Sequence, residues 1–236
     1  MTITSLRVVV ILGTLTIGAG AQQTAPVQLL TRLDHLVYAT PDLQLGIDTI
    51  EKQVGVRASP GGQHPGLGTR NALVALGPAS YLEIIGPDPE QPAPNGVRRF
   101  GINTLKSPRL VAWVAKGTEL ESLAASAAQN GVRLGAVIAG SRRRPDGVIL
   151  SWRYTDPNTV VADGLIPYFI DWGTSPHPAT TAAKGATLIA VRAEHPDAER
   201  VQKRLTALAL DLPVQHGSAP ALIATISGPR GRIELR

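Results

Sequence analysis

Two polar side chains interrupt apolar stretches of the sequence where strands are expected. His35 lies within the apolar run 33–39, and Glu83 lies within the apolar run 81–85. A neutral imidazole is a good metal ligand and also a base near pH 7, whereas a buried carboxylate needs a cation, a metal or a hydrogen-bond donor beside it. We therefore hypothesise that His35 and Glu83 are catalytic residues or metal ligands that face one cleft. A hydrogen-bonded core histidine and a solvent-facing glutamate are the alternatives.

A glycine-rich segment and the strand expected after it offer a second set of polar groups. His64 lies in the segment 61–66, whose glycines let the backbone approach a ligand closely but also make ordinary turns. Arg70 can pair with a substrate carboxylate through two N–H groups, and Asn71 follows it. We hypothesise that these three residues contact a substrate. A plain connector and a solvated edge charge are the alternatives.

The densest aromatic cluster, in a chain with 4% aromatic residues, lies at 168–172. Asp171 and Trp172 close this apolar run, and His177 follows in a segment rich in proline. Aromatic side chains either line an apolar pocket or fill a core. Trp172 and His177 are therefore candidate substrate contacts, with core packing and a surface turn as the alternatives. Asp171 is a candidate cleft carboxylate.

Several common catalytic arrangements are missing from the sequence. The chain has no cysteine, which excludes thiolate nucleophiles, disulfides and cysteine-ligated zinc. It has no Gly-x-Ser-x-Gly, P-loop or His-Glu-x-x-His motif, so serine hydrolases, nucleotide hydrolases and zincins are poorly supported. The net charge of +5 is spread along the chain and aromatic residues are few, so no nucleic-acid partner is expected. The pair His195 and Glu199 is expected to face solvent, and 142–147 is expected to form a solvated hairpin tip.

The sequence predicts the same order of elements three times, and these elements must position the polar residues. An apolar run, an amphipathic helix and three short strands follow one another in 32–86, in 109–173 and in 185–236. A βαβββ module forms a curved sheet whose concave face is buried only when another module pairs with it, which leaves a cleft. The predicted fold is α+β, with tandem βαβββ modules that form curved mixed sheets around a cleft. The third module either extends the sheet or makes a homodimer contact.

Residues 1–21 have the layout of a secretory signal peptide. Arg7 precedes the apolar run 8–18, and the small residues Ala19 and Ala21 follow it. The run is shorter than the about 20 residues that a transmembrane helix needs. We expect cleavage after Ala21 and a secreted or periplasmic mature protein without a membrane span. An uncleaved membrane anchor is the alternative.

Taken in order, several segments resemble the glyoxalase-like branch of the vicinal-oxygen-chelate superfamily. The resemblance covers 32–180 and rests on LDHLVY with PDL, GGQHPG followed by GTRNAL, YLEIIGPDP, and PYFIDWG with HP. It implies a metal or substrate cleft between paired modules, into which a histidine of the first strand and a carboxylate of the last strand point. The matching residues are His35 and Glu83. The strand expected at 110–114 has no histidine, and Asp171 only approximately occupies the second carboxylate position.

The resemblance leaves two functions open, and both have a small-molecule partner. The first is an enzyme of lyase, isomerase or dioxygenase type that acts on a small oxygenated substrate. A divalent metal would be held by His35, Glu83 and Asp171, with His64 and His177 as other candidate ligands, and Mn, Fe, Ni or Zn would suit such ligands. The second is a metal-free protein that binds or sequesters a small molecule.

Overall fold

The computed structural model describes Met1, residues 31–94, residue 96 and residues 98–236. The signal peptide expected at 1–21 lies, apart from Met1, outside the described residues. Within the part of the chain that is described, no helix is long and apolar enough to cross a membrane.

The order βαβββ occurs three times along the described chain; two short 3-10 turns lie between the modules and a third lies within the second module. The first set is β1 Leu33–Ala39, α1 Leu43–Val54, β2 Ser59–His64, β3 Thr69–Gly77 and β4 Ser80–Pro87. The second set is β5 Arg109–Lys116, α2 Leu120–Gln129, β6 Val137–Arg143, β7 Ile149–Thr155 and β8 Tyr168–Asp171. The third set is β9 Thr187–His195, α3 Ala198–Ala207, β10 Val214–His216, β11 Ala221–Gly228 and β12 Gly231–Leu235. The turns are η1 Arg99–Thr104, η2 Ala162–Gly164 and η3 Pro178–Thr180.

Helix α1 illustrates how local sequence sets the limits of an element. The Asp42 side chain accepts a hydrogen bond from the Leu45 backbone N–H at 2.8 Å, which caps the first turn. Gly55 ends the helix in the left-handed region, with φ of 84°, where a residue without a Cβ is favoured. Ile50 and Val54 are buried on one face, so the helix packs against the outside of the sheet.

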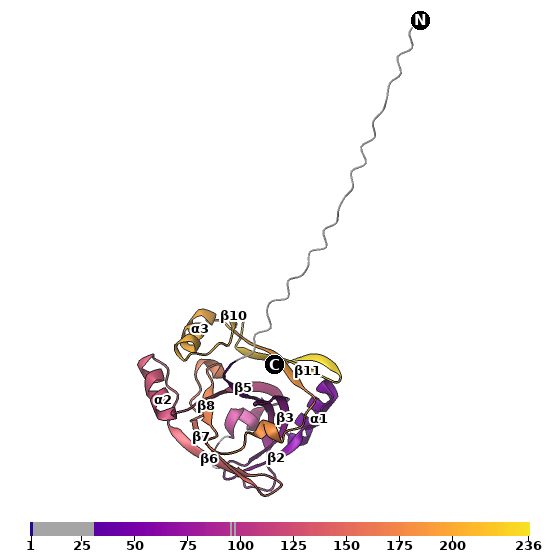
Figure 1. The fold of residues 1–236 in the computed structure, drawn as a ribbon, viewed down its shortest axis with the longest axis vertical. Helices are drawn as coiled ribbons and strands as arrows, with labels where there is room; N and C mark the ends of the chain where they lie inside the picture. Colours follow the sequence, from indigo (N-terminus) through magenta and orange to yellow (C-terminus); the bar gives the residue numbers. More distant parts are fainter. Residues whose placement is uncertain (2–30, 95, 97) are drawn as a thin grey trace.

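The first two modules together form one curved, nearly barrel-shaped sheet of eight strands. The strand order is β2-β3-β4-β1-β5-β8-β7-β6, in which β1 runs parallel to β4 and antiparallel to β5. Figure 1 looks into this ring and shows β2 and β6, the two edge strands, lying next to each other. The predicted α+β class with curved mixed sheets is confirmed.

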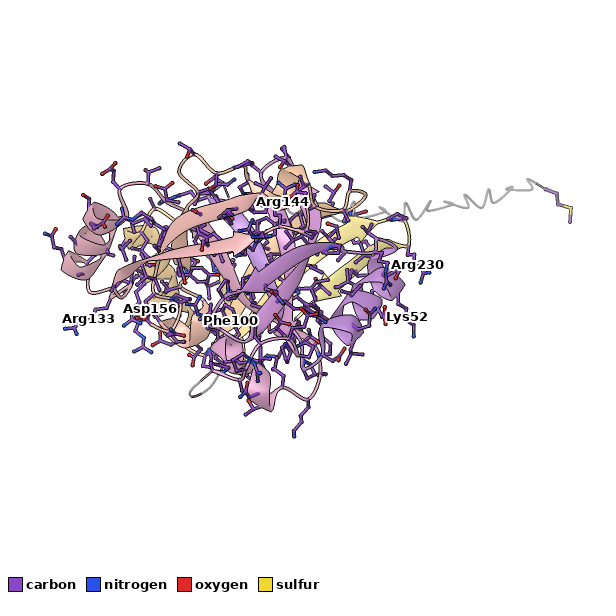
Figure 2. The ribbon with its side chains drawn as sticks, turned by 90° about the horizontal axis from the view of Figure 1, so that it is seen from below. Lys52, Phe100, Arg133, Arg144, Asp156 and Arg230 are labelled. Atoms are coloured by element: carbon purple, nitrogen blue, oxygen red, sulfur yellow. The ribbon has the colours of Figure 1, made fainter. Side chains whose placement is uncertain are left out.

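The two edges of the sheet meet at a seam between β2 and β6, which Figure 2 shows from outside as first-module strands crossing second-module strands. A Cβ on Gly62 would lie 2.5 Å from the Arg143 carbonyl oxygen, and one on Gly61 would lie 2.1 Å from Asn71 Oδ1. Glycine is therefore required for this close approach. Across the seam, Arg142 Nη1 donates a hydrogen bond to the Gly61 carbonyl oxygen.

The third module forms a separate four-stranded sheet in the order β10-β9-β11-β12. Its apolar face joins the same hydrophobic core as β1, β4 and α1, with Leu205, Leu212 and Ile226 among its buried residues. The backbone N–H of Leu110 in β5 donates to the Arg236 carbonyl oxygen at 2.7 Å. The module therefore packs on the outside of the ring, next to β5 and α1 (Figure 1).

Two strands begin later than the sequence pattern predicts. Residues 56–59 and 134–139 have the apolar pattern of short strands, but the strands found there are β2, which begins at Ser59 and takes in 61–64 of the glycine-rich segment, and β6, which begins at Val137. Both strands pair along an antiparallel neighbour, although neither has a regular apolar alternation. As a result, residues 142 and 143 belong to a strand and not to an exposed hairpin tip.

Candidate functional site

A cavity of about 390 Å³ lies inside the ring formed by the first two modules. The first module contributes the polar groups His35, His64, Asn71 and Glu83. The second module contributes mainly aromatic rings and a cation, namely Trp152, Tyr154, Tyr168, Trp172 and Arg142. A cavity of this size, in which several polar groups converge beside aromatic rings, suits a small molecule.

A β-bulge in β1 places Asp34 beside His35. The register of β1 against β5 shifts between Leu33 and His35, so that Asp34 is the extra residue. Consecutive strand residues normally point to opposite faces, and a bulge re-aims them. Asp34 Oδ1 therefore lies 2.7 Å from His35 Nδ1.

The contact with Asp34 sets the direction in which His35 can act. A carboxylate next to Nδ1 holds the proton there, which leaves Nε2 as an acceptor. Nε2 lies 3.4 Å from the Tyr168 hydroxyl and 3.7 Å from Glu83 Oε2. The imidazole stacks on the Tyr81 ring, with centroids 4.6 Å apart and an interplanar angle of 16°. His35 therefore presents a fixed, basic nitrogen to the cavity.

Asp34 is a buried anion, 1% exposed, that accepts hydrogen bonds from three side chains. Besides His35, Trp172 Nε1 lies 3.1 Å and His177 Nε2 lies 3.2 Å from its Oδ2. Burial alone would raise the pKa of Asp34, but the hydrogen bonds from His177 and His35 outweigh it and hold that pKa well below its usual range. Asp34 is therefore ionised at neutral pH and keeps the His35 ring in place.

A second chain of contacts in the cavity lining runs through Glu83, Asn71 and His64. Asn71 Nδ2 donates to Glu83 Oε1 at 2.6 Å and lies 3.2 Å from His64 Nε2. His64 Nδ1 lies 3.0 Å from Thr69 Oγ1. The amide donor next to Nε2 requires a neutral His64 that accepts at this nitrogen. Burial, the largest effect, lowers the pKa of His64 to about 4 even though Glu83 opposes the shift.

The low pKa of His64 predicts a loss of stability in mild acid. The unfolded imidazole takes up a proton below about pH 6.5, whereas the folded one stays neutral down to about pH 4. The free energy of unfolding should therefore fall between these values by about 3 kcal/mol from this residue. The His64→Gln variant keeps a polar side chain without this titration. Urea unfolding at pH 7, 5.5 and 4.5 should show a shallower decline in the variant, and equal declines would contradict the assignment.

The rest of the cavity lining combines aromatic rings with two arginines. Arg99, in η1, donates from Nη2 to the Tyr154 hydroxyl at 2.8 Å, and its guanidinium lies 5.2 Å from the centroid of that ring. Arg142 is 4% exposed. Burial raises the pKa of Tyr168 well above its usual range, so its hydroxyl keeps its proton at neutral pH. The cavity lining thus offers cationic and hydroxyl donors together with the imidazole of His35.

The residues present do not make the complete metal-ligand set that the family resemblance implies. Val114 lies opposite His35 in the pairing of β1 with β5, and Tyr168 lies opposite Val114 in the pairing of β5 with β8. Neither is a histidine or a carboxylate. Among the described residues, no group of three or more histidine, aspartate or glutamate side chains is arranged to hold a metal ion.

The structure brings together most, but not all, of the residues singled out from the sequence. His35, Glu83, His64, Asn71 and Trp172 line the cavity, and His177 lies behind it, against Asp34. Arg70 and Asp171 are elsewhere.

Asp171 alternates along β8 with the cavity-lining residues Ile170 and Trp172, so it points to the other face, where its Oδ1 accepts from the Gly173 N–H at 2.8 Å. Arg70 lies 4.0 Å from Glu90 on the outside of β3.

Three important residues of the site were missed or misplaced by the sequence analysis. Asp34 carried a usable signal, because it is a second polar residue in a fully buried apolar strand. Arg142 was expected in a solvated hairpin tip but is buried, because β6 extends through it to the seam. Tyr168 belongs to the aromatic cluster for which a pocket wall and a core were both left open, and only the strand pairing shows that it faces His35. His195, also expected to be exposed, is buried and contacts Asp163 at 3.0 Å.

Paired βαβββ modules that close around a polar cavity define the vicinal-oxygen-chelate class of folds. The family model described as a glyoxalase-like domain matches residues 33–209, and the chain belongs to this family. No curated protein sequence matches the chain.

Solved structures share the fold at low sequence identity. A hypothetical protein from Staphylococcus aureus is 14% identical, with 87% of this chain and 84% of that chain covered and a TM-score of 0.56. Methylmalonyl-CoA epimerase from Mycobacterium tuberculosis is 18% identical, with 67% and 98% covered and a TM-score of 0.40. A variant of the Streptomyces coelicolor epimerase in complex with 2-nitronate-propionyl-CoA is 20% identical, with 64% and 100% covered and a TM-score of 0.42. The likeness to the Staphylococcus aureus protein concerns the fold alone.

Proposed function

We propose that this protein catalyses proton transfer on a small oxygenated carbonyl compound held in the cavity, with His35 as the base. The observation that carries the proposal is the Asp34–His35 pair, in which a buried carboxylate holds Nδ1 at 2.7 Å and directs Nε2 into the cavity. An imidazole oriented in this way by a carboxylate is a recurring form of general base. The proposed class of activity is isomerase or lyase.

The proposed step needs no group beyond the side chains of the cavity. His35 Nε2 removes a proton from a carbon next to the carbonyl, and the electron pair of that C–H bond moves to the carbonyl oxygen to form an enolate. The Tyr168 hydroxyl, 3.4 Å from Nε2, is placed to donate a hydrogen bond to this oxygen. Return of a proton from the imidazolium to the same carbon re-forms the carbonyl and, after exchange with solvent, labels that carbon. An isomerisation results when the first carbon carries a hydroxyl: the imidazolium then protonates the former carbonyl carbon, and the hydroxyl proton passes to the former carbonyl oxygen as a new carbonyl forms on the first carbon.

The alternative function is binding or sequestration of the same kind of molecule without chemistry. The aromatic wall supports it, since Trp152 and Trp172 have ring centroids 5.2 Å apart and both line the cavity. The third candidate function uses a divalent metal held by His35 and Glu83. This metal would need a further ligand from outside the protein or from a rearranged His64.

Solvent deuterium exchange tests these functions directly. Protein dialysed against a chelator would be incubated in D₂O with 4-phenyl-2-oxobutanoate, pyruvate, dihydroxyacetone and acetol, and loss of the C–H signals would be followed by proton NMR. We expect faster exchange than in buffer for at least one compound, and no stoichiometric metal by elemental analysis. Exchange that appears only after Mn, Fe, Ni or Zn is restored would support the metal variant, and saturable binding without exchange would support sequestration.

We also propose that the mature protein works outside the cytoplasm, in the periplasm or as a secreted protein. The charged start, the apolar run 8–18 and the small residues at Ala19 and Ala21 support this. N-terminal sequencing of protein isolated from its native host should begin at Gln22. A soluble cytoplasmic product that retains Met1 would contradict the proposal.

A further inference from the structure

Arg142 is a buried cation without a carboxylate partner among the described residues. It is 4% exposed, and its one hydrogen bond within that part of the chain runs from Nη1 to the Gly61 carbonyl oxygen. The remaining guanidinium N–H groups have no partner there. A buried charge is costly unless an opposite charge or several hydrogen bonds compensate it.

The carboxylate in the same cavity does not fill this role. Glu83 accepts a hydrogen bond from Asn71 at 2.6 Å, and its oxygens lie 3.7 Å from His35 Nε2 and 3.7 Å from His64 Nε2. Asp34, the other buried carboxylate near the cavity, is occupied by three side-chain donors. The guanidinium of Arg142 therefore faces a cavity whose own anions are already engaged.

A second cation lines the same space. Arg99 lies over the Tyr154 ring and likewise has no carboxylate partner among the described residues. Both arginines act on His64, since they add to the effect of its burial in lowering its pKa. The cavity lining thus holds two arginines and one carboxylate, Glu83, and neither arginine is paired with a carboxylate of the described residues.

We infer that Arg142 forms a carboxylate subsite and that the substrate is a small monocarboxylate with an apolar or aromatic body. This inference deepens the proposed function, on which it rests for the claim that the occupant is a substrate. A guanidinium recognises a carboxylate through parallel N–H donors. Trp152, Tyr154 and Trp172 form the apolar wall for the rest of the molecule. Glu83 disfavours a dianion such as a phosphate ester in the same cavity.

Binding of unreactive pairs tests the subsite without any need for catalysis. The probes are acetate and acetamide, benzoate and benzamide, and 3-phenylpropanoate and 3-phenylpropanamide, with phenyl phosphate as the dianion. Titration calorimetry and the fluorescence of Trp152 and Trp172 report binding. We expect at least one carboxylate to bind about tenfold or more tightly than its amide, as expected for a hydrogen bond to a charged group, and more tightly than phenyl phosphate.

The neighbouring arginine provides a matched control. Arg143 is exposed on the opposite side of β6 and donates to the Gly147 carbonyl oxygen at 3.0 Å. Arg142→Met should reduce the preference for the carboxylate to near unity, whereas Arg143→Met, with the same change in net charge, should preserve it. Arg142→Lys, which keeps the charge and limits any loss of folding, should retain part of the preference. Circular dichroism checks the fold of all three variants.

Several outcomes would overturn the inference. These are the absence of saturable binding by any carboxylate up to its solubility limit, equal binding of carboxylates and amides, tighter binding of phenyl phosphate, and equal losses in Arg142→Met and Arg143→Met. The proposed function fails in a different experiment: carboxylate binding without deuterium exchange would leave the subsite standing and remove the catalytic role. Deuterium exchange without any preference for carboxylates would support the catalytic role and remove the carboxylate subsite.

Discussion

Replacing His35 by glutamine should reduce the rate of deuterium exchange by two to four orders of magnitude, because it removes the proposed base. General acid–base groups contribute about 10²- to 10⁴-fold to the rates of enzymes that use them. Glutamine keeps a polar side chain next to Asp34 but has no basic nitrogen near pH 7. The exchange rate would be measured by proton NMR on the compound that the wild-type protein exchanges fastest.

A histidine outside the cavity supplies the control for this variant. His216 is exposed in β10, so the His216→Gln variant should exchange at the wild-type rate. Thermal unfolding of both variants separates a catalytic from a structural role of His35. If the His35→Gln variant exchanges at the wild-type rate and only melts earlier, His35 is a core residue and the proposed mechanism is wrong.

The Asp34→Asn variant is expected to lose both exchange activity and stability. The new amide N–H group would face His35, Trp172 and His177, which now donate to the Asp34 carboxylate. Without that carboxylate, the proton of His35 would move from Nδ1 to Nε2, the nitrogen that must be free to act as the base. Breaking a buried ionic hydrogen-bond network costs about 3 kcal/mol or more in the free energy of unfolding. Urea unfolding and the exchange assay together measure the two effects.

The difference in unfolding free energy between the wild type and the Asp34→Asn variant should change with pH in a defined direction. The pKa of Asp34 is depressed in the folded protein, so its stabilising contribution is complete above the unfolded value of 3.8 and is lost as the pH falls below it. The gap in unfolding free energy between wild type and Asp34→Asn should therefore be full at pH 7 and narrower at pH 3. Glu199→Gln, which removes an exposed carboxylate, should change stability by about 0.5 kcal/mol or less. A gap that widens in acid would contradict the assignment.

The parts of the site that were predicted from the sequence are those with a strong local signal. His35 and Glu83 stand out because each interrupts an apolar strand, and period-two alternation correctly places Tyr81, Glu83 and Ile85 on one face, which lines the cavity. The fold class follows from the repeated order of apolar runs and amphipathic helices. These features depend on a few neighbouring residues, which a single sequence displays.

The parts that were not predicted depend on contacts between distant segments. The role of Arg142 requires β6 to continue to the seam, and the tip expected at 142–147 looked solvated because its residues are polar. Asp34 touches His35 only because a bulge breaks the strict alternation of β1. Asp171 was assigned from its place at the end of a strand, but a shift of one residue along a strand turns a side chain to the opposite face.

The seam between β2 and β6 differs from the other contacts between neighbouring strands of the ring. Among the described strands, every other pair of neighbours in the ring is joined by a backbone ladder, so parting them would break buried main-chain hydrogen bonds. At the seam, the connection is a side-chain hydrogen bond from Arg142 and the contact of glycine-rich backbone with β6. Separating β2 from β6 would therefore break one side-chain hydrogen bond and leave every backbone ladder of the ring, with its register, intact.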